Sequence, residues 1–154
     1  MRILLFLGIV LFVSCQGNTV FDKNKRLDNR QWHWKEQLNL VQEIKDTNAF
    51  YSLWINARIN TDYPYNNLYV NATCKYPDGT TLKMSPELLL FDKNGMPLGQ
   101  RKGSVIENRI RINKKLVFDQ SGLYEFTLTQ NMRNNTLPGI LDIGLALIRE
   151  GEDL

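Results

Sequence analysis

The residues that could carry chemistry in this 154-residue chain are few: two cysteines, one histidine and scattered carboxylates. His33 is the sole histidine, so a Ser-His or Cys-His pair would have to use it. Zinc needs several closely spaced Cys and His ligands, and the segment from Asp92 to Gly95 has too few carboxylates for a calcium loop. No two carboxylates stand out as a glycosidase pair. Many carboxylates are available, so a hydrolase stays open as an alternative, but the sequence singles out no catalytic residue, metal or cofactor.

Of the two cysteines, Cys15 is the one that follows a segment typical of an export signal. An apolar run over residues 3–13 follows a single arginine. As a helix this run is about 16 Å long at ~1.5 Å per residue. A stable membrane span needs about 20 apolar residues, so the run indicates a secretory signal instead. The letters "FVSC" at 12–15 resemble the bacterial lipobox, with Phe in place of the usual Leu. We predict a signal peptide over 1–14 and attachment of diacylglycerol and an acyl chain at Cys15, in preference to a plain signal peptide.

Residues 15–30 are mostly polar and are predicted to form the lipidated N-terminus and a tether, to which Val20 and Phe21 add a short strand at most. The folded domain is predicted over 31–154. The net charge of +3 becomes +2 when the signal peptide is removed with its arginine. Basic residues of the tether are interspersed with acids, so no nucleic-acid partner is expected.

Alternation of apolar and polar residues with a period of two predicts strands through the rest of the chain. These strands cover residues 38–44, 51–59, 68–76, 87–92, 124–129 and 141–147. Cys74 lies on the apolar face of its strand, where a cysteine behaves as a small hydrophobic residue. The 141–147 segment has few polar outward positions and is predicted to lie in the interior of a sheet.

Turn residues separate these strands. Asp78-Gly79 and Asn94-Gly95 are strong hairpin signals, and residues 119–122 and 137–139 mark two more corners. Ser85 and Pro86 suit the start of a single helical turn. Short strands with regular turns predict an all-β fold, a single antiparallel β-sandwich that is jelly-roll-like or immunoglobulin-like.

Aromatic residues offer one candidate binding surface. Trp32 and Trp34 would share a face if both lay on one strand, and Tyr63 and Tyr65 have the same spacing. Exposed, these four side chains form a patch for stacking sugars or docking a protein. Buried, they belong to the core. The first alternative predicts a periplasmic carbohydrate-binding or peptidoglycan-binding module.

Three longer segments resemble a known family: "RINTDYPYNNLYVN" at 58–71, "LFDKNGMPLGQRKG" at 90–103 and "QNMRNNTLPGILDIGLAL" at 130–147. They are similar to the GldH gliding-motility lipoproteins of the Bacteroidota. The motif residues are Tyr63, Pro64, Tyr65, Asn67 and Leu68, then Asp92, Gly95, Leu98 and Gly99, and finally Gln130, Met132, Arg133, Leu137, Gly139, Ile140, Asp142 and Gly144.

The resemblance implies a non-enzymatic cell-envelope protein that acts in gliding motility alongside other Gld lipoproteins and the type IX secretion apparatus. In this lineage, acidic residues just after the lipidated cysteine direct lipoproteins to the cell surface. Residues 16–19 contain none. We therefore expect an outer-membrane lipoprotein whose domain faces the periplasm.

A polar loop within the last matched segment is the candidate interaction site. It consists of Asn131, Met132, Arg133 and Asn134, between two apolar strands. Loops on rigid scaffolds commonly carry binding, and a guanidinium suits a partner carboxylate. The alternative is that Arg133 pairs internally, for instance with Asp142, and only fixes the corner.

Overall fold

A computed structural model describes residues 18–152. Almost all of this region is strand, with one short 3₁₀ turn η1 (Asp28–Arg30). The strands are β1 (Thr19–Arg26), β2 (Gln31–His33), β3 (Leu38–Ile44), β4 (Ala49–Asn60), β5 (Asn67–Lys75), β6 (Thr81–Met84), β7 (Glu87–Leu89), β8 (Gln100–Lys102), β9 (Val105–Val117), β10 (Gly122–Gln130), β11 (Thr136–Pro138) and β12 (Ile140–Glu152).

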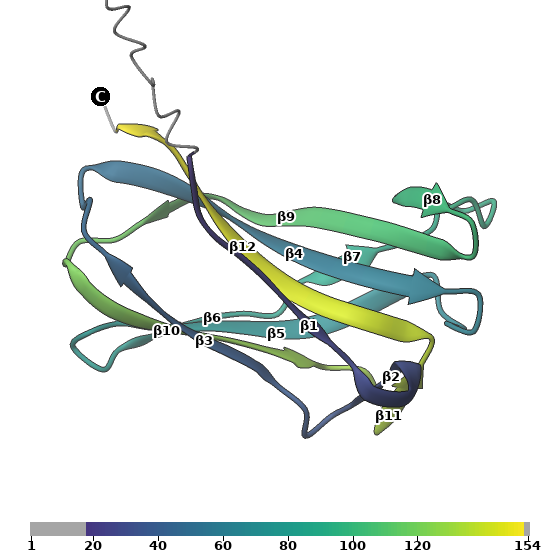
Figure 1. Ribbon diagram of the computed structural model, residues 1–154. Coiled ribbons are helices and arrows are strands. Elements are labelled where there is room, and N and C mark those ends of the chain that lie inside the picture. Colours follow the sequence, from purple (N-terminus) through teal and green to yellow (C-terminus); the bar gives the residue numbers. More distant parts are fainter. Residues whose placement is uncertain (1–17, 153–154) are drawn as a thin grey trace, which may run out of the picture.

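Two antiparallel sheets pack face to face with the core between them (Figure 1). One sheet, which we call the N-terminal sheet, has the strand order β1-β12-β4-β9-β8. The second sheet has the order β3-β10-β5-β6, and β7 also pairs with β5. β2 and β11 form a small separate ladder. The prediction of an all-β antiparallel sandwich is confirmed.

Alternation decides which side chains enter the core. Along β4 the inward residues Tyr51, Leu53, Ile55, Ala57 and Ile59 are all buried, as predicted. Cys74 on β5 is also buried. β12, predicted to be interior, lies between β1 and β4. The period-2 pattern therefore assigned these faces correctly, because each strand has one side against the opposite sheet.

β9 is one of the longest strands in the sheet, although the period-2 pattern predicted no strand there. Its inward positions include Asn108, and its outward positions carry Arg109 and Arg111. An inward amide and long cationic side chains weaken the apolar alternation that the prediction relied on. The helical turn expected at Ser85 is also absent from the described residues: the chain there stays extended and enters β7.

The tether is shorter than predicted, because β1 is part of the sandwich. It pairs with β12 along its whole length, from Thr19 opposite Ile148 to Arg26 opposite Asp142. Phe21 is buried against Phe126 of the opposite sheet, with ring centroids 5.1 Å apart. β1 looked like a tether in sequence because it is an edge strand, and most of its side chains other than Phe21 are solvated.

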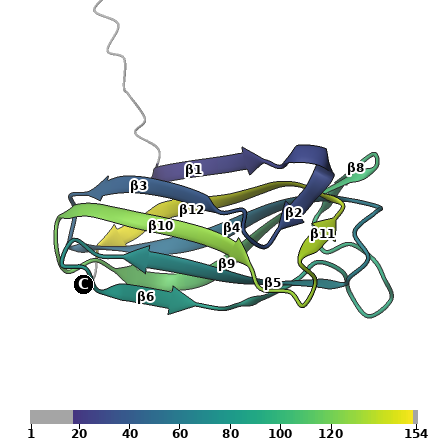
Figure 2. The same ribbon diagram turned by 90° about the horizontal axis from the view of Figure 1, so that it is seen from below.

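The two ends of the sandwich differ (Figure 2). At the end where β1 begins, which we call the N-terminal end, the connections are the short segments 45–48, 76–80 and 118–121. The opposite end, which we call the motif end, carries the longer segments 27–37, 61–66, 90–99 and 131–135. The three stretches that carry the family resemblance thus place their loops together at the motif end.

Candidate functional site

Cys15, the predicted lipid attachment site, lies outside the described residues. Those residues start at Asn18, and the backbone of Asn18 is already part of the fold, since its carbonyl accepts a hydrogen bond from Arg149 N at 2.7 Å. The predicted attachment site therefore precedes Asn18 by three residues in sequence.

The predicted interaction loop, residues 131–134, is shaped by one buried side chain. Gln130 is 5% exposed, and its amide Nε2 donates to the carbonyl of Asn134 at 2.9 Å. Its Oε1 accepts from the backbone N–H of Met132 at 2.7 Å. The backbone N–H of Asn131 donates to Tyr69 O of β5 at 2.8 Å. The loop is thus held in one conformation by hydrogen bonds at both of its ends and in its middle.

Arg133 is exposed at the tip of this loop. The predicted alternative, an internal pair with Asp142, does not form: Asp142 Oδ2 accepts from Arg58 NH1 at 2.8 Å. Within residues 18–152 no carboxylate lies in ion-pair distance of Arg133. A guanidinium with five donors on a rigid loop is available to bind an external acceptor.

Met132 and Trp34 flank the loop with apolar surface. Met132 is half-buried, and its sulfur accepts a hydrogen bond from Tyr69 N at 3.3 Å. Trp34 is 49% exposed, and its backbone N–H donates to Asn135 O at 2.8 Å, which ties the β2–β3 connection to the loop. Part of the predicted aromatic patch and the predicted loop are therefore neighbours on one surface.

The four aromatic residues do not form a common exposed patch, because Trp32 and Tyr63 follow the buried alternative. Trp32 is fully buried, and its indole N–H donates to Glu36 O at 2.9 Å. It does not share a face with Trp34 because β2 ends at His33, between the two tryptophans. The alternation that would have aligned them stops there.

Tyr63 is buried as well, and only Tyr65 of this pair is half-exposed. The hydroxyl of Tyr63 donates to Asn67 O at 2.6 Å, and burial raises the pKa of this hydroxyl. Tyr65 packs edge-on against Tyr63 with centroids 5.7 Å apart. Tyr63 therefore fixes the β4–β5 connection, which is a structural role.

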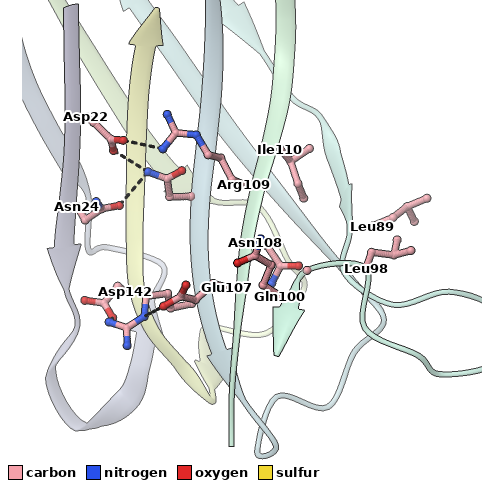
Figure 3. A pocket seen from close by; sticks show the side chains of 13 residues that line it. Asp22, Asn24, Leu89, Leu98, Gln100, Glu107, Asn108, Arg109, Ile110 and Asp142 are labelled. Carbon is pink, nitrogen blue, oxygen red and sulfur yellow. Dashed lines mark hydrogen bonds and ion pairs between the residues drawn. The ribbon is translucent and has the colours of Figure 1, made fainter. Parts of the chain in front are cut away.

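A second feature is a polar cleft of about 520 Å³ that extends from the outer face of the N-terminal sheet across β9 to Leu89 and Leu98 (Figure 3). Its polar side is contributed by β1, β4, β9 and β12, and its other side by exposed Leu89 and Leu98. The polar residues that line it are Asp22, Asn24, Asn56, Arg58, Gln100, Glu107, Asn108, Arg109 and Asp142.

The charges in the cleft neutralise one another. Arg58 donates to Asp142 at 2.8 Å and lies 3.5 Å from Glu107. Lys102 lies 2.6 Å from Glu107, and this hydrogen bond lowers the pKa of the Glu107 carboxyl. Asn56 Oδ1 is buried with no hydrogen-bond partner in the described structure. The cleft suits a neutral, polar ligand better than a strongly charged one.

The cleft was not predicted from the sequence. Alternation along β4 does place Asn56 and Arg58 on the outward face, and this was the available signal. The partners of these residues come from β1 and β9, whose registers against the sheet could not be read from one sequence. Gln130 was noticed as a motif residue, but its buried position under the loop was not foreseen.

The described residues offer little to support catalysis. Burial raises the pKa of the Cys74 thiol to about 12, so it is an unreactive core group. Residues 18–152 contain no cluster of three His, Cys, Asp or Glu side chains arranged to hold a metal ion. In the same range no helix has the length and apolar character needed to cross a membrane.

Comparisons with known proteins agree with the sequence motifs. The family model described as "GldH lipoprotein" matches residues 19–147. A protein of Christiangramia forsetii named "Gliding motility lipoprotein GldH homolog" is 32% identical, over 90% of this chain and 89% of that relative. "Gliding motility lipoprotein GldH" of Flavobacterium johnsoniae is 26% identical, over 94% of this chain and 93% of that relative.

Likeness to solved structures is low. The infectious bursal disease virus VP2 subviral particle covers 86% of this chain with a TM-score of 0.40 and 13% identity, and this chain covers 34% of it. A score of this size adds nothing to the fold assignment. The family match spans nearly all of the sandwich, and the chain belongs to the GldH lipoprotein family.

Proposed function

We propose that this protein is a non-enzymatic interaction subunit of the gliding-motility apparatus and its associated type IX secretion system. Membership of a lipoprotein family makes it a membrane-anchored protein of the cell envelope. The proposed anchor is a diacylglycerol and an acyl chain on Cys15. This anchor has three acyl chains; two already hold a protein firmly, whereas one chain alone gives only marginal binding. The proposed location is the periplasmic side of the outer membrane.

One observation carries the assignment of an interaction role: a prebuilt loop presents an unpaired cation. Gln130 fixes the backbone of residues 131–134, so binding a partner there costs little ordering entropy. Arg133 is exposed on this loop, Met132 beside it is half-buried, and the exposed Trp34 is bonded through its backbone to Asn135 at the end of the loop. Arginine and aromatic residues are the types that most often dominate the energy of protein interfaces. The proposed partners are other Gld lipoproteins or secretion components that present a carboxylate.

A crosslinking pull-down from cells that carry the natively anchored protein tests this function. The wild-type protein is expected to recover a defined set of envelope proteins, and Arg133→Ala is expected to lose them. Lys83→Ala removes an exposed cation on β6, away from the loop, and should leave the recovery unchanged. Equal recovery by wild type and Arg133→Ala would contradict a role for this loop. Recovery of cytosolic proteins alone would contradict the envelope assignment.

The polar cleft favours a second candidate function, the binding of a carbohydrate or peptidoglycan fragment. Its volume is within the usual range for small-molecule sites, and its internally paired charges suit a neutral polyol. A hydroxyl group of such a ligand could donate to Asn56 Oδ1. Titration of the protein with soluble muropeptides, followed by amide chemical shifts, should then perturb β1, β4 and β9. Asn56→Ala should abolish the shifts, and their absence in the wild type would dismiss this candidate.

A further inference from the structure

The distance between the proposed lipid and the folded domain is very short. Only Gln16 and Gly17 lie between Cys15 and Asn18, and the carbonyl of Asn18 is already bonded to β12. Three Cα–Cα steps span about 10 Å at most. The short distance rests on the proposed attachment at Cys15. The part of the sandwich that lies nearest the lipid then depends on where β1 begins.

The segment from Cys15 to Asn18, which we call the stalk, cannot be lengthened without a cost in folding free energy, because β1 is fixed along its length. It pairs with β12 from Thr19 onward, and Phe21 is 4% exposed against Phe126. Peeling β1 away would break this ladder and expose an aromatic ring that the core buries. Thr19 lies opposite Ile148, which lies opposite Ser52, so the anchor holds the sandwich three residues in from the start of β4.

We propose that the N-terminal end of the sandwich rests against the headgroups of the bilayer that holds the anchor, and that the motif end points away from it. The connections at the N-terminal end have at most five residues each, over 45–48, 76–80 and 118–121, which makes this end blunt. β4 has 12 residues and runs from this end to the motif end. At ~3.3 Å per residue, it separates the two ends by about 40 Å.

The chemistry of the N-terminal end suits a phospholipid surface. Lys45 and Lys114 are exposed there and match headgroup phosphates. Of its acids, Asp46 and Asp78 are held by hydrogen bonds within the protein, to Arg149 and to Thr80. Glu43 lies 3.4 Å from Lys45, and Asp119 is exposed. Val117 is 44% exposed at the end of β9 and can contact the edge of the headgroup layer.

Fluorescence quenching in vesicles tests this orientation. The mature, lipidated chain is placed in vesicles of phosphatidylethanolamine and phosphatidylglycerol that contain a headgroup-nitroxide lipid. Single cysteines are introduced by Ser121→Cys at the N-terminal end and by Asn94→Cys at the motif end, both at exposed positions, and are labelled with one fluorophore. The Ser121→Cys label should be quenched several-fold more strongly. The parent protein serves as the labelling blank because its Cys74 is buried.

A stalk variant supplies the matched control. A flexible Gly/Ser insertion of about 20 residues after Gly17 releases the domain from the surface, and the two labels should then be quenched alike. Equal quenching of the two labels with the native stalk, or stronger quenching of the Asn94→Cys label, would overturn the orientation. Mass spectrometry of the same sample separates the two proposals: an acylated chain with equal quenching refutes only the orientation, whereas a chain without acyl groups refutes the proposed anchor itself.

Discussion

Asp22 and Arg109 are 87 residues apart in sequence and are joined by an ion pair of 2.6 Å, although β12 and β4 lie between their strands. Three strand spacings amount to about 14 Å, so the pair must reach across the outer face of the sheet. Figure 3 shows the two side chains pointing toward one another, joined by a dashed line. Asn56 Nδ2 donates to Asp22 Oδ1 at 2.8 Å and completes the connection.

Gly144→Ala is expected to destabilise the protein. A Cβ at this position would lie 2.0 Å from Asn24 Oδ1 and 2.8 Å from the carbonyl oxygen of Lys23. The carbonyl belongs to the paired backbone of β1 and cannot move aside without loosening the strand. We expect a loss of about 1–3 kcal/mol in the free energy of unfolding, the usual cost of overpacking, measured by urea denaturation.

The double variant Gly144→Ala/Asn24→Ala isolates the side-chain part of this cost. It removes the nearest clashing atom and should recover part, but not all, of the lost stability, because the Lys23 carbonyl remains. A single Gly144→Ala variant as stable as the wild type would show that β1 does not lie as closely on β12 as described.

Gln130→Ala should destabilise the 131–134 loop. The substitution leaves the Met132 N–H and the Asn134 carbonyl without their buried partner. We expect a loss of about 1–3 kcal/mol in unfolding free energy. Faster hydrogen exchange is expected at the amide of Met132. Asn131→Ala is the control, because replacing this exposed side chain should change the unfolding free energy by no more than about 0.5 kcal/mol. Unchanged exchange at Met132 in Gln130→Ala would contradict the proposed rigidity.

The stability of the protein is expected to fall in acid. A hydrogen bond from Arg149 to Asp46 holds the pKa of the Asp46 carboxyl below its ordinary value. Because the unfolded chain has the higher pKa, the ionised form favours folding. Its contribution is complete above about pH 4 and is lost as the pH falls through the folded value.

Thermal midpoints measured from neutral pH down to the acid range check this expectation. Asp46→Asn should flatten part of the decline, and Arg149→Ala should have a similar effect because it removes the main cause of the shift. A wild-type decline of the same steepness as that of both variants would mean that this pair makes no contribution to acid sensitivity.

The sequence predicted the faces of β4, β5 and β12 because each has one buried side, and the resulting alternation is visible locally. It did not predict the bounds of β1 or the position of β9. Many side chains of both strands are solvated, so β1 looks like a tether in sequence and β9 like an unstructured segment. It also placed Trp32 with Trp34, because the end of β2 at His33 depends on pairing with β11. The cleft depends on cross-strand register, which one sequence does not contain. What could not be predicted is thus what tertiary contacts decide.

The processed protein should contain no reactive thiol until it unfolds. Cys74 is buried, its pKa is raised to about 12, and only a thiolate attacks a disulfide reagent. With Cys15 modified by diacylglycerol through its sulfur, we expect no reaction with a thiol reagent near pH 8 for the folded chain. One thiol per chain should react in denaturant. Two reactive thiols in denaturant would mean that Cys15 carries no lipid on its sulfur. If only one thiol reacts in denaturant and it also reacts in the folded chain, the core around β5 must open.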